Sequence, residues 1–232
     1  MASIIDDNII KQYKQLKGIR VLYANMGSLN HNKMDQFRLI VNQLAPDMVC
    51  ITETWFNDTV QDIEVAINGY NLIRNDRSDK KGGGIAIYYN SSRMNVNVID
   101  YSTNFELLLV DVKHNMTKHF KLAVIYRPPG PECEFLELFD NFLVNYTDEE
   151  LIITGDFNID LMKENKKYEK IFSAKYYKQL ILEPTRVTKT SQTLIDHIFT
   201  NFYNNITGSG VLDLSLSVII NLHILAEKLI II

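Results

Sequence analysis

Five apolar segments of this sequence lead directly into a polar residue whose side chain can contact a metal ion or a phosphate group. Each segment has the composition of a buried strand, and short acidic and amide side chains are unfavourable inside strands. Strand ends gather along one edge of a sheet, so these side chains are expected to converge in one cleft. They are Asn25 after "VLYA", Glu53 after "VCIT", Tyr126 after "LAVI", Asp156 and Asn158 after "LIITG", and Asp196 after "TLI".

The residue types in this set predict metal-assisted hydrolysis of a phosphodiester bond. Mg²⁺ takes one or two carboxylates and fills its other positions with water and substrate phosphate. Asp156 and Asn158 can activate and orient a water, because alternate residues of an extended segment face the same way. A tyrosine hydroxyl and an amide can donate hydrogen bonds to a phosphate oxygen as charge develops there. Each residue alone is better explained as a turn, rim or core position, so the prediction depends on their conjunction.

Alternating strands and helices would have to position these residues. Apolar residues at helical spacing predict a helix over 32–46 and another over 133–146, and a Lys-rich stretch near 163–179 also indicates a helix. Short apolar runs separated by Gly, Ser, Asn and Asp predict an antiparallel meander over 69–112. Strands in runs with helices inserted between some of them favour a layered α/β (α+β) sandwich over a doubly wound parallel sheet.

The absence of an internal repeat or a linker predicts one domain over 19–232, preceded by a polar N-terminal extension over 1–18 that contains a short helix. The net charge of −4 argues against a surface that coats polyanions generally, although a local basic groove is compatible with it. Cys50 lies in an apolar run far from Cys133, which indicates a buried thiol and a reducing compartment. Without a cationic start followed by an apolar stretch, the chain is not expected to be secreted. The apolar segment 217–232 is too short and too mixed to span a membrane.

Several segments in this order resemble the endonuclease/exonuclease/phosphatase superfamily. They are "ANMGSLNHNKMDQF", "ITETW", "IYRPPG", "ITGDFNID" and "TLIDHIFTN". The resemblance covers about Ile19 to Gly210 and is strongest to the endonuclease domains of non-LTR (LINE-type) retrotransposons. It implies a DNase I-like fold of two packed mixed sheets flanked by helices. It also implies a monomer that nicks target DNA with Mg²⁺ or Mn²⁺, without a nucleotide cofactor, inside the cell and in the nucleus.

The same resemblance implies a role for each residue at the strand ends. Glu53 would hold the divalent metal with Asn25 beside it, Asp156 would position or deprotonate the attacking water, and Asn158 would help to bind the phosphate. Tyr126 would contact the scissile phosphate.

Three further residues receive a role from the resemblance alone. Asp196 would orient a catalytic histidine. Arg186, next to Thr185, and Thr193 match a stretch of the family that lies near the DNA, so both are expected to bind substrate.

The sequence departs from the family at its final Ser-Asp-His triplet, which here reads Ser215-Leu216-Ser217 within an atypical end that begins at about residue 216. Leucine offers no oxygen, and serine neither accepts a proton near neutral pH nor carries positive charge. His197 would point to the opposite face of its strand from Asp196. His223 would have to fold back to substitute.

Three functions remain open from the sequence. The first is a retrotransposon endonuclease that is truncated or impaired. The second is a non-catalytic remnant of the fold that binds DNA weakly. The third is a phosphatase or lipid phosphodiesterase on the same scaffold, which the retrotransposon-like "YRPP" and "LIDHIFTN" segments disfavour.

Overall fold

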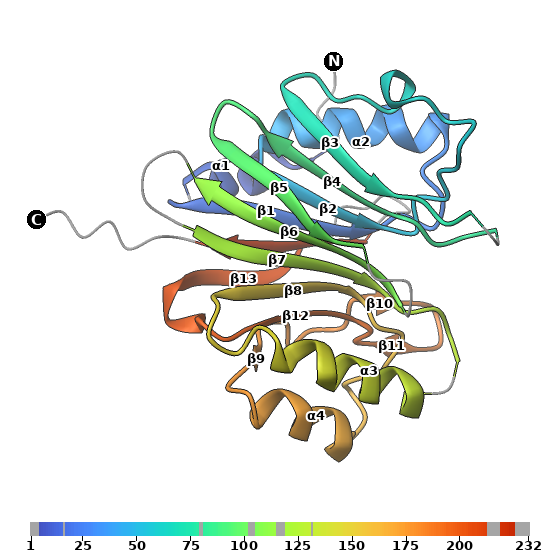
Figure 1. The fold of residues 1–232 in the computed structure, drawn as a ribbon. Coiled ribbons are helices and arrows are strands. Elements are labelled where there is room, and N and C mark those ends of the chain that lie inside the picture. Colours follow the sequence, from blue (N-terminus) through green and yellow to red (C-terminus); the bar gives the residue numbers. More distant parts are fainter. Residues whose placement is uncertain are drawn as a thin grey trace, which may run out of the picture.

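Two six-stranded β-sheets pack against each other, and helices cover the outer face of each sheet (Figure 1). The computed structural model describes residues 5–15, 17–78, 81–101, 105–114, 119–130, 132–212 and 219–225, the last of these as backbone alone. The order helix, sheet, sheet, helix confirms the predicted four-layered sandwich. Within the described ranges, no helix is long and apolar enough to cross a membrane.

The first sheet has the strand order β13-β14-β1-β2-β4-β3. The β1 and β2 strands are parallel, and the other neighbours in this sheet are antiparallel. Its strands are β1 (Ile19–Asn25), β2 (Met48–Thr52), β3 (Tyr70–Asn75), β4 (Ile85–Asn90), β13 (Ile206–Leu212) and β14 (Ile219–Leu225).

The second sheet has the order β5-β6-β7-β8-β12-β9, with β7 and β8 as its parallel pair. Its strands are β5 (Met94–Asp100), β6 (Glu106–His114), β7 (His119–Tyr126), β8 (Leu151–Asp156), β9 (Lys178–Gln179) and β12 (Asp196–Thr200). A small separate ladder joins β10 (Arg186–Val187) to β11 (Gln192–Thr193).

Helix α2 (His31–Leu44) shows how the sequence specifies these elements. Its buried residues include Met34, Phe37 and Val41, which recur at the spacing of one helical face. The Asn30 side chain caps the first turn by accepting a hydrogen bond from the Lys33 amide at 3.2 Å. The predicted helix over this segment is confirmed.

The remaining helices cover the two outer faces of the sandwich (Figure 1). Helix α1 (Asp7–Gln15) lies with α2 over the first sheet, where it buries Tyr13, so the N-terminal segment packs on the domain. Helices α3 (Glu132–Val144) and α4 (Lys166–Ser173) cover the second sheet. Two single-turn 3₁₀ helices complete the set, η1 (Asp62–Glu64) and η2 (Tyr203–Asn205).

The hydrophobic core forms three layers, one between the sheets and one under each pair of helices. Alternation along β1 divides its side chains between two of these layers. Leu22 and Ala24 face the helices, whereas Val21 and Tyr23 face the space between the sheets. The Tyr23 hydroxyl is therefore buried between the two sheets, where it needs a hydrogen-bond partner.

The predicted meander over 69–112 is wrong in one respect. The β3 and β4 strands pair antiparallel in the first sheet, whereas β5 and β6 pair antiparallel in the second. The chain crosses between the sheets at residues 91–93. Local patterns of apolar residues and turn formers do not specify which sheet a hairpin joins, because that choice depends on packing between distant segments.

Gly155 allows the parallel strands β7 and β8 to approach closely beside the end of β8. A Cβ atom at this position would lie 1.8 Å from the Ile125 carbonyl oxygen, well inside the contact distance of the two atoms. Glycine in a strand often marks such a close backbone approach. Strand packing therefore requires glycine at position 155, directly before Asp156 of the predicted site.

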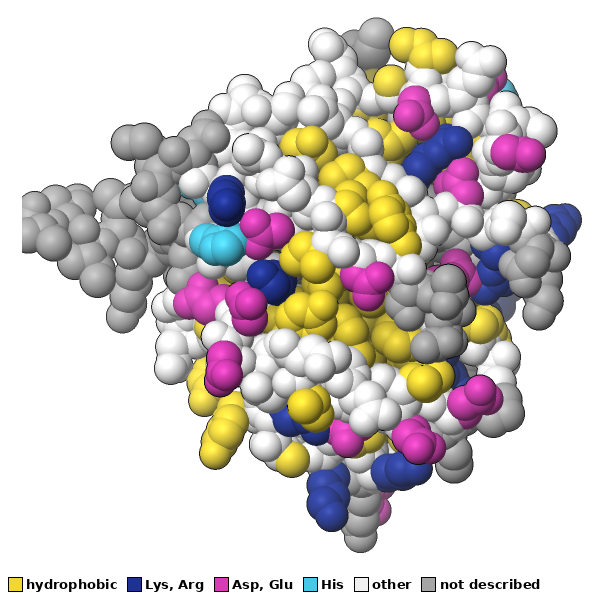
Figure 2. Space-filling view, viewed as in Figure 1, with side chains coloured by type: hydrophobic (Ala, Val, Ile, Leu, Met, Phe, Trp, Pro, Cys, Tyr) yellow, Lys and Arg dark blue, Asp and Glu magenta, His cyan; other side chains and the backbone are white. Residues whose placement is uncertain are grey.

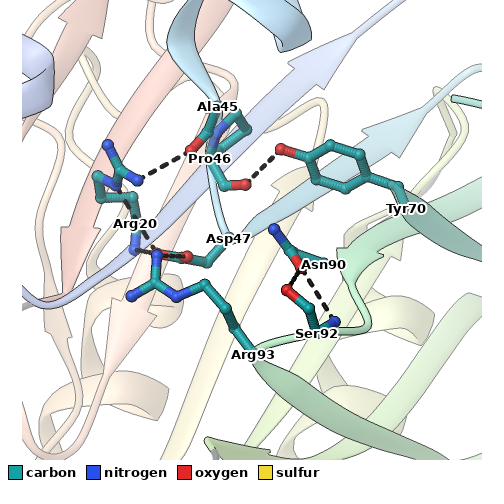
Figure 3. A network of polar contacts seen from close by, with 8 residues as sticks. All are labelled: Arg20, Ala45, Pro46, Asp47, Tyr70, Asn90, Ser92 and Arg93. Carbon is teal, nitrogen blue, oxygen red and sulfur yellow. Dashed lines mark hydrogen bonds and ion pairs between the residues drawn. The ribbon is translucent and has the colours of Figure 1, made fainter. Parts of the chain in front are cut away.

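A buried carboxylate fixes the end of the first sheet at which β1 and β2 begin (Figure 3). The side chain of Asp47 is fully buried and pairs with Arg20 at the start of β1 and with Arg93 in the crossing between the sheets. The Arg20 amide donates to Asp47 at 2.8 Å, and the Tyr70 hydroxyl donates to the Pro46 carbonyl at 2.5 Å. This network joins the first sheet to the connection that leads into the second.

Candidate active site

A cleft of about 510 Å³ opens at the edge of the sandwich where strands of both sheets end. It is lined by every residue predicted for the site except Thr193. Six residues outside the prediction complete the lining: Met26, Gly27, Lys33, Trp55, Pro129 and Ile195.

Parallel strand pairs bring four of these side chains to the same edge. Asn25 ends β1 and Glu53 follows β2, its parallel neighbour in the first sheet. Tyr126 ends β7 and Asp156 ends β8, and these strands pair directly with Tyr126 opposite Asp156. Because the two sheets pack face to face, both sets of strand ends border one cleft.

The prediction that Asp196 ends a strand is wrong, since it is the first residue of β12. The β12 strand runs antiparallel to β8, so its beginning lies beside the end of β8, with Asp196 directly opposite Asp156. Residues opposite each other on neighbouring strands point to the same face. The two carboxylates therefore still meet at the edge that the sequence predicts.

Asp156 lies at the centre of the polar contacts in the cleft. Its Oδ2 accepts a hydrogen bond of 2.7 Å from the Asn25 side-chain amide, which links the two sheets. Its Oδ1 accepts from the Asn158 backbone amide at 2.9 Å. Asn158 has a left-handed backbone (φ 48°), and its side-chain amide donates to the Arg127 carbonyl at 2.8 Å. Asp156 and Asn158 thus lie in one tight turn at the end of β8, so the prediction that they share a face of an extended segment is wrong.

Glu53 is held in an unusual backbone conformation. Its φ of 57° lies in the left-handed region, which is strained for a residue other than glycine. Its carbonyl accepts from the Ser28 amide at 2.8 Å, and its Oε2 accepts from the Trp55 indole N–H at 2.5 Å. Burial raises the pKa of Tyr126, and the nearby Glu53 carboxylate raises it further. The contacts with Ser28 and Trp55 orient the carboxylate from both the backbone and the side-chain end.

A glycine-rich loop supports Glu53 from behind. A Cβ atom on Gly84 would lie 2.5 Å from the Thr54 hydroxyl oxygen, so only glycine allows this loop to approach the segment after β2. The Gly84 amide donates to Glu106 at 2.7 Å, and Glu106 forms an ion pair with Arg77. The Arg77 guanidinium in turn lies 5.4 Å from the centre of the Tyr126 ring. Gly84 is therefore required by packing behind the cleft.

Tyr23, which was not predicted from the sequence, and Thr185 hold Asp196 in place. The Tyr23 hydroxyl donates to Asp196 Oδ1 at 2.9 Å, and the Thr52 hydroxyl lies 2.7 Å from the same tyrosine oxygen. The buried Thr185 hydroxyl lies beside the Asp196 carboxylate and accepts from the Asp196 amide at 3.1 Å. The alternation of Val21, Tyr23 and Asn25 was an available signal, since it places Tyr23 on the same face as Asn25.

Burial gives the aspartate pair an unusual protonation equilibrium. Loss of solvent raises the pKa of Asp156 above its usual range, and the neighbouring charge of Asp196 raises it further. Burial likewise raises the pKa of Asp196, although hydrogen bonds from Thr185 and Tyr23 oppose this shift. The metal-free cleft therefore favours retention of a proton by the pair near neutral pH.

Positive charge enters the cleft from Arg186 and Lys33. Arg186 is exposed, and its charge lowers the pKa of both Asp156 and Asp196. The Lys33 ammonium donates to the Met26 carbonyl at 2.7 Å. Thr193 pairs with Arg186 across the small β10–β11 ladder but does not line the cleft. On the face drawn in Figure 2, the described acidic and basic side chains are interspersed and form no continuous basic surface.

His197 is a structural residue on the opposite face of β12, as the alternation of strand side chains predicts. Its ring is fully buried and stacks on Phe157 at a centroid distance of 5.0 Å. Nδ1 lies 2.7 Å from the Tyr168 hydroxyl and Nε2 lies 3.1 Å from the Leu194 carbonyl, so the neutral ring accepts from the first and donates to the second. Burial lowers the pKa of His197 to about 4.

Ser215, Leu216 and Ser217 lie outside the described residues. The backbone of His223 is described, and it pairs with Val21 in the β1–β14 ladder. Ile219, the first residue of β14, pairs with Asn25 at the cleft edge. His223 thus lies four residues along the strand from that edge, roughly 13 Å away at the usual rise per residue.

The donor set of the cleft fits a hard divalent cation that keeps much of its water. Among the described residues, no three His, Cys, Asp or Glu side chains form a group that encloses a metal ion. Mg²⁺ does not need such a group, since it binds through one or two carboxylates together with water and phosphate oxygens. Glu53, Asn25 and Asp156 offer carboxylate and amide oxygens of this type around one cleft.

We expect Tyr23→Phe to test the support of Asp196. Loss of the hydroxyl leaves a fully buried carboxylate with one donor fewer, which costs about 1–3 kcal/mol in free energy of unfolding. It also raises the pKa of Asp196 further, because the lost hydrogen bond lowers it. Urea unfolding at several pH values measures both effects. A variant as stable as the parent at every pH would contradict this role.

Comparison with known proteins identifies the fold. The sequence model of the Endonuclease/Exonuclease/phosphatase family matches residues 22–209. None of the curated proteins compared matches the chain. The endonuclease domain of TRAS1, a telomere-specific non-LTR retrotransposon, is a similar solved structure with a TM-score of 0.70 and 17% identity, covering 90% of this chain and 99% of that domain.

Two AP endonucleases share the same architecture. The enzyme from Archaeoglobus fulgidus has a TM-score of 0.68 at 12% identity, covering 89% of this chain and 99% of its own. The enzyme LMAP from Leishmania major has a TM-score of 0.69 at 10% identity, covering 95% of this chain and 96% of its own. At these identities the likeness establishes the fold alone.

Proposed function

This chain belongs to the endonuclease/exonuclease/phosphatase family, and on that premise we propose that it is a metal-dependent DNA endonuclease that nicks target DNA. The observation that carries the proposal is the convergence of Glu53, Tyr126, Asp156, Asn158 and Asp196 on one oxygen-rich cleft. The structural likeness to a retrotransposon endonuclease domain supports a retrotransposon origin.

Glu53 and Asn25 are the residues that would hold Mg²⁺ or Mn²⁺. When bound, the ion would supply positive charge to a phosphate oxygen of the substrate. The hydrogen bond from Trp55 holds the Glu53 carboxylate at the cleft.

Asp156 is the residue proposed to take the proton from the attacking water. It is buried, and the Asn25 and Asn158 amides orient its two oxygens. A raised pKa makes a carboxylate a stronger base once it is ionised. The positive charge of Arg186 favours that ionised form.

Tyr126, Asn158 and Arg186 are proposed to contact the scissile phosphate, with Thr193 contacting DNA outside the cleft. A hydroxyl, an amide and a guanidinium are all donors, and donors that face developing negative charge stabilise the transition state. Burial and the nearby Glu53 carboxylate raise the pKa of Tyr126, so its hydroxyl keeps its proton and remains a donor.

The Ser215-Leu216-Ser217 sequence is the basis for proposing impaired activity. No imidazole of a described side chain reaches Asp196, because His197 is bound on the other face of β12 and the remaining described histidines do not line the cleft. The competing reading, a non-catalytic remnant that binds DNA, predicts salt-dependent binding without cleavage. We further propose that the protein acts as a monomer in the nucleus, where its substrate is found.

A plasmid-nicking assay tests this function. We expect supercoiled DNA to convert slowly to the open circle in Mg²⁺ or Mn²⁺ and to stay intact in EDTA. The Glu53→Gln variant keeps the shape of the side chain and removes its charge, so it controls for contaminating nucleases. Cleavage that persists in EDTA or in Glu53→Gln would contradict the proposal.

A further inference from the structure

A second hollow of about 360 Å³ adjoins the cleft, and Trp55 lines both. This side hollow lies between the start of α2 and the segment that follows β2. Its apolar floor is formed by Leu29, Met34, Phe56 and Val65, which are all buried. Its volume lies at the lower end of the range of about 300–1,000 Å³ for small-molecule sites, which suits one planar ring rather than a stretch of duplex.

The rim of the side hollow is polar. Ser28, Asn30 and Thr59 place hydroxyl and amide groups around the apolar floor. A nucleobase has the same division, with two apolar faces and an edge of hydrogen-bond donors and acceptors. The combination of floor and rim therefore matches a base better than it matches a purely aliphatic or a purely charged ligand.

Trp55 lies between the cleft and the side hollow, and its ring is held in a fixed orientation. Its side chain is 38% exposed although its indole N–H is bound to Glu53. Its backbone is left-handed (φ 59°), and its amide donates to the Gly83 carbonyl at 2.9 Å. The Lys81 ammonium lies 5.4 Å from the ring centre. An exposed ring that is already held in place loses little conformational entropy when a ligand stacks on it.

Cations lie in the cleft and over the Trp55 ring. Lys33 and Arg186 line the cleft, and Lys81 lies over the Trp55 ring. A nucleic-acid strand with its backbone in the cleft would place its phosphates near these cations. Because Trp55 lines both the cleft and the side hollow, a base next to the scissile phosphate would then lie beside the side hollow.

We propose that the side hollow is a subsite for one unpaired nucleobase of the DNA strand bound in the cleft, with Trp55 as the ring on which the base stacks. This inference rests on the proposed function, because the strand in the cleft delivers the base. It adds a contact that selects single-stranded or locally opened DNA, since a paired base cannot leave its stack without cost.

The test compares two probes in EDTA, so that no cleavage occurs. One is a short single-stranded oligodeoxynucleotide, and the other is the same backbone with every base replaced by an abasic analogue. We expect the full-length chain to prefer the base-bearing probe and Trp55→Ala to reduce that preference by about 5- to 150-fold, the contribution of one stacked base. Any effect of the substitution on Glu53 acts on both probes equally and cancels in the ratio.

Tyr203→Ala is the matched control. Tyr203 is 40% exposed and carries Lys178 at 5.3 Å from its ring centre, yet it lies in η2, away from the cleft. It should keep the preference of the parent chain. Thr59→Trp, which fills the side hollow from its exposed rim without removing Trp55, should lower the preference as Trp55→Ala does.

The outcomes separate this inference from the proposed function. An unchanged preference in Trp55→Ala, or equal binding of both probes by a parent chain that nicks plasmid, would overturn the subsite alone. Failure to bind either probe at low salt, together with failure to nick plasmid, would overturn both proposals.

Discussion

Replacing Leu216 with aspartate and Ser217 with histidine is expected to raise the rate of plasmid nicking in Mg²⁺ by roughly 10²- to 10⁴-fold, the usual worth of a positioned general acid–base group. The double substitution restores the Asp-His pair that the family resemblance places after Ser215. Restoring the aspartate at the same time can bring the gain above that of the imidazole alone, since residues that act as a unit are not additive.

The register of β14 is the structural reason to expect a gain at these positions. Ile219 pairs with Asn25, so the chain enters β14 at the cleft edge of the first sheet. Leu216 and Ser217 precede Ile219 by only three and two residues. Asp196, which the restored imidazole would contact, is already held by Tyr23 and Thr185.

A matched variant separates the effect of an acid–base group from the effect of added polar side chains. Leu216→Asn with Ser217→Asn adds hydrogen-bonding groups but no group that titrates near neutral pH, so its rate should stay at the parent level. A restored histidine should also introduce a rate dependence between about pH 5 and 8. Equal rates for the parent and the Asp-His version would mean that the triplet lies elsewhere in the chain.

The Asp156→Asn substitution is expected to lower nicking by roughly 10²- to 10⁴-fold when introduced into the Asp-His version, where activity is high enough to measure. An amide has the same shape but does not take a proton from water. The same substitution should raise the melting temperature of the metal-free protein at mildly alkaline pH, where the Asp156 carboxylate of the parent is ionised. It removes a buried charge that lies opposite Asp196.

The sign of the stability change follows from the raised pKa values. A carboxyl whose pKa is higher in the folded state binds its proton more tightly there, so its favourable contribution is present at low pH and is lost as pH rises through the folded value. The metal-free parent should therefore lose stability between mildly acidic and mildly alkaline pH, as Asp156 and Asp196 ionise. Asp156→Asn should flatten that dependence, which thermal unfolding in EDTA measures.

Asp160→Asn is the control for the effects of Asp156→Asn on the nicking rate and on stability. Asp160 lies four residues further along the same segment and does not line the cleft. Its Oδ1 accepts from the Leu194 and Met162 amides at 3.1 Å, and the asparagine carbonyl oxygen keeps both contacts. It should leave the nicking rate nearly unchanged. A loss of activity as large as that of Asp156→Asn would argue against a specific role for Asp156.

The sequence by itself was sufficient for the features that depend on neighbouring residues. The helix at α2 follows from the spacing of Met34, Phe37 and Val41 and from the Asn30 cap, which are local properties. The strand ends at Asn25 and Tyr126 follow from apolar runs that stop in polar residues. The hydrogen bond from the Asn158 amide to the Asp156 side chain spans three residues, so no distant segment is needed to specify this turn.

Which distant segments meet depends on packing that no local pattern of the sequence specifies. The tertiary structure split the expected meander between two sheets, placed Asp196 at the beginning rather than the end of a strand, and brought Tyr23 from the first sheet to Asp196 in the second. It also left Thr193 outside the cleft and opened a second hollow behind Trp55. These features depend on strand order and on packing between sheets, which arise from contacts between residues far apart in the chain and leave no periodic pattern within any one segment.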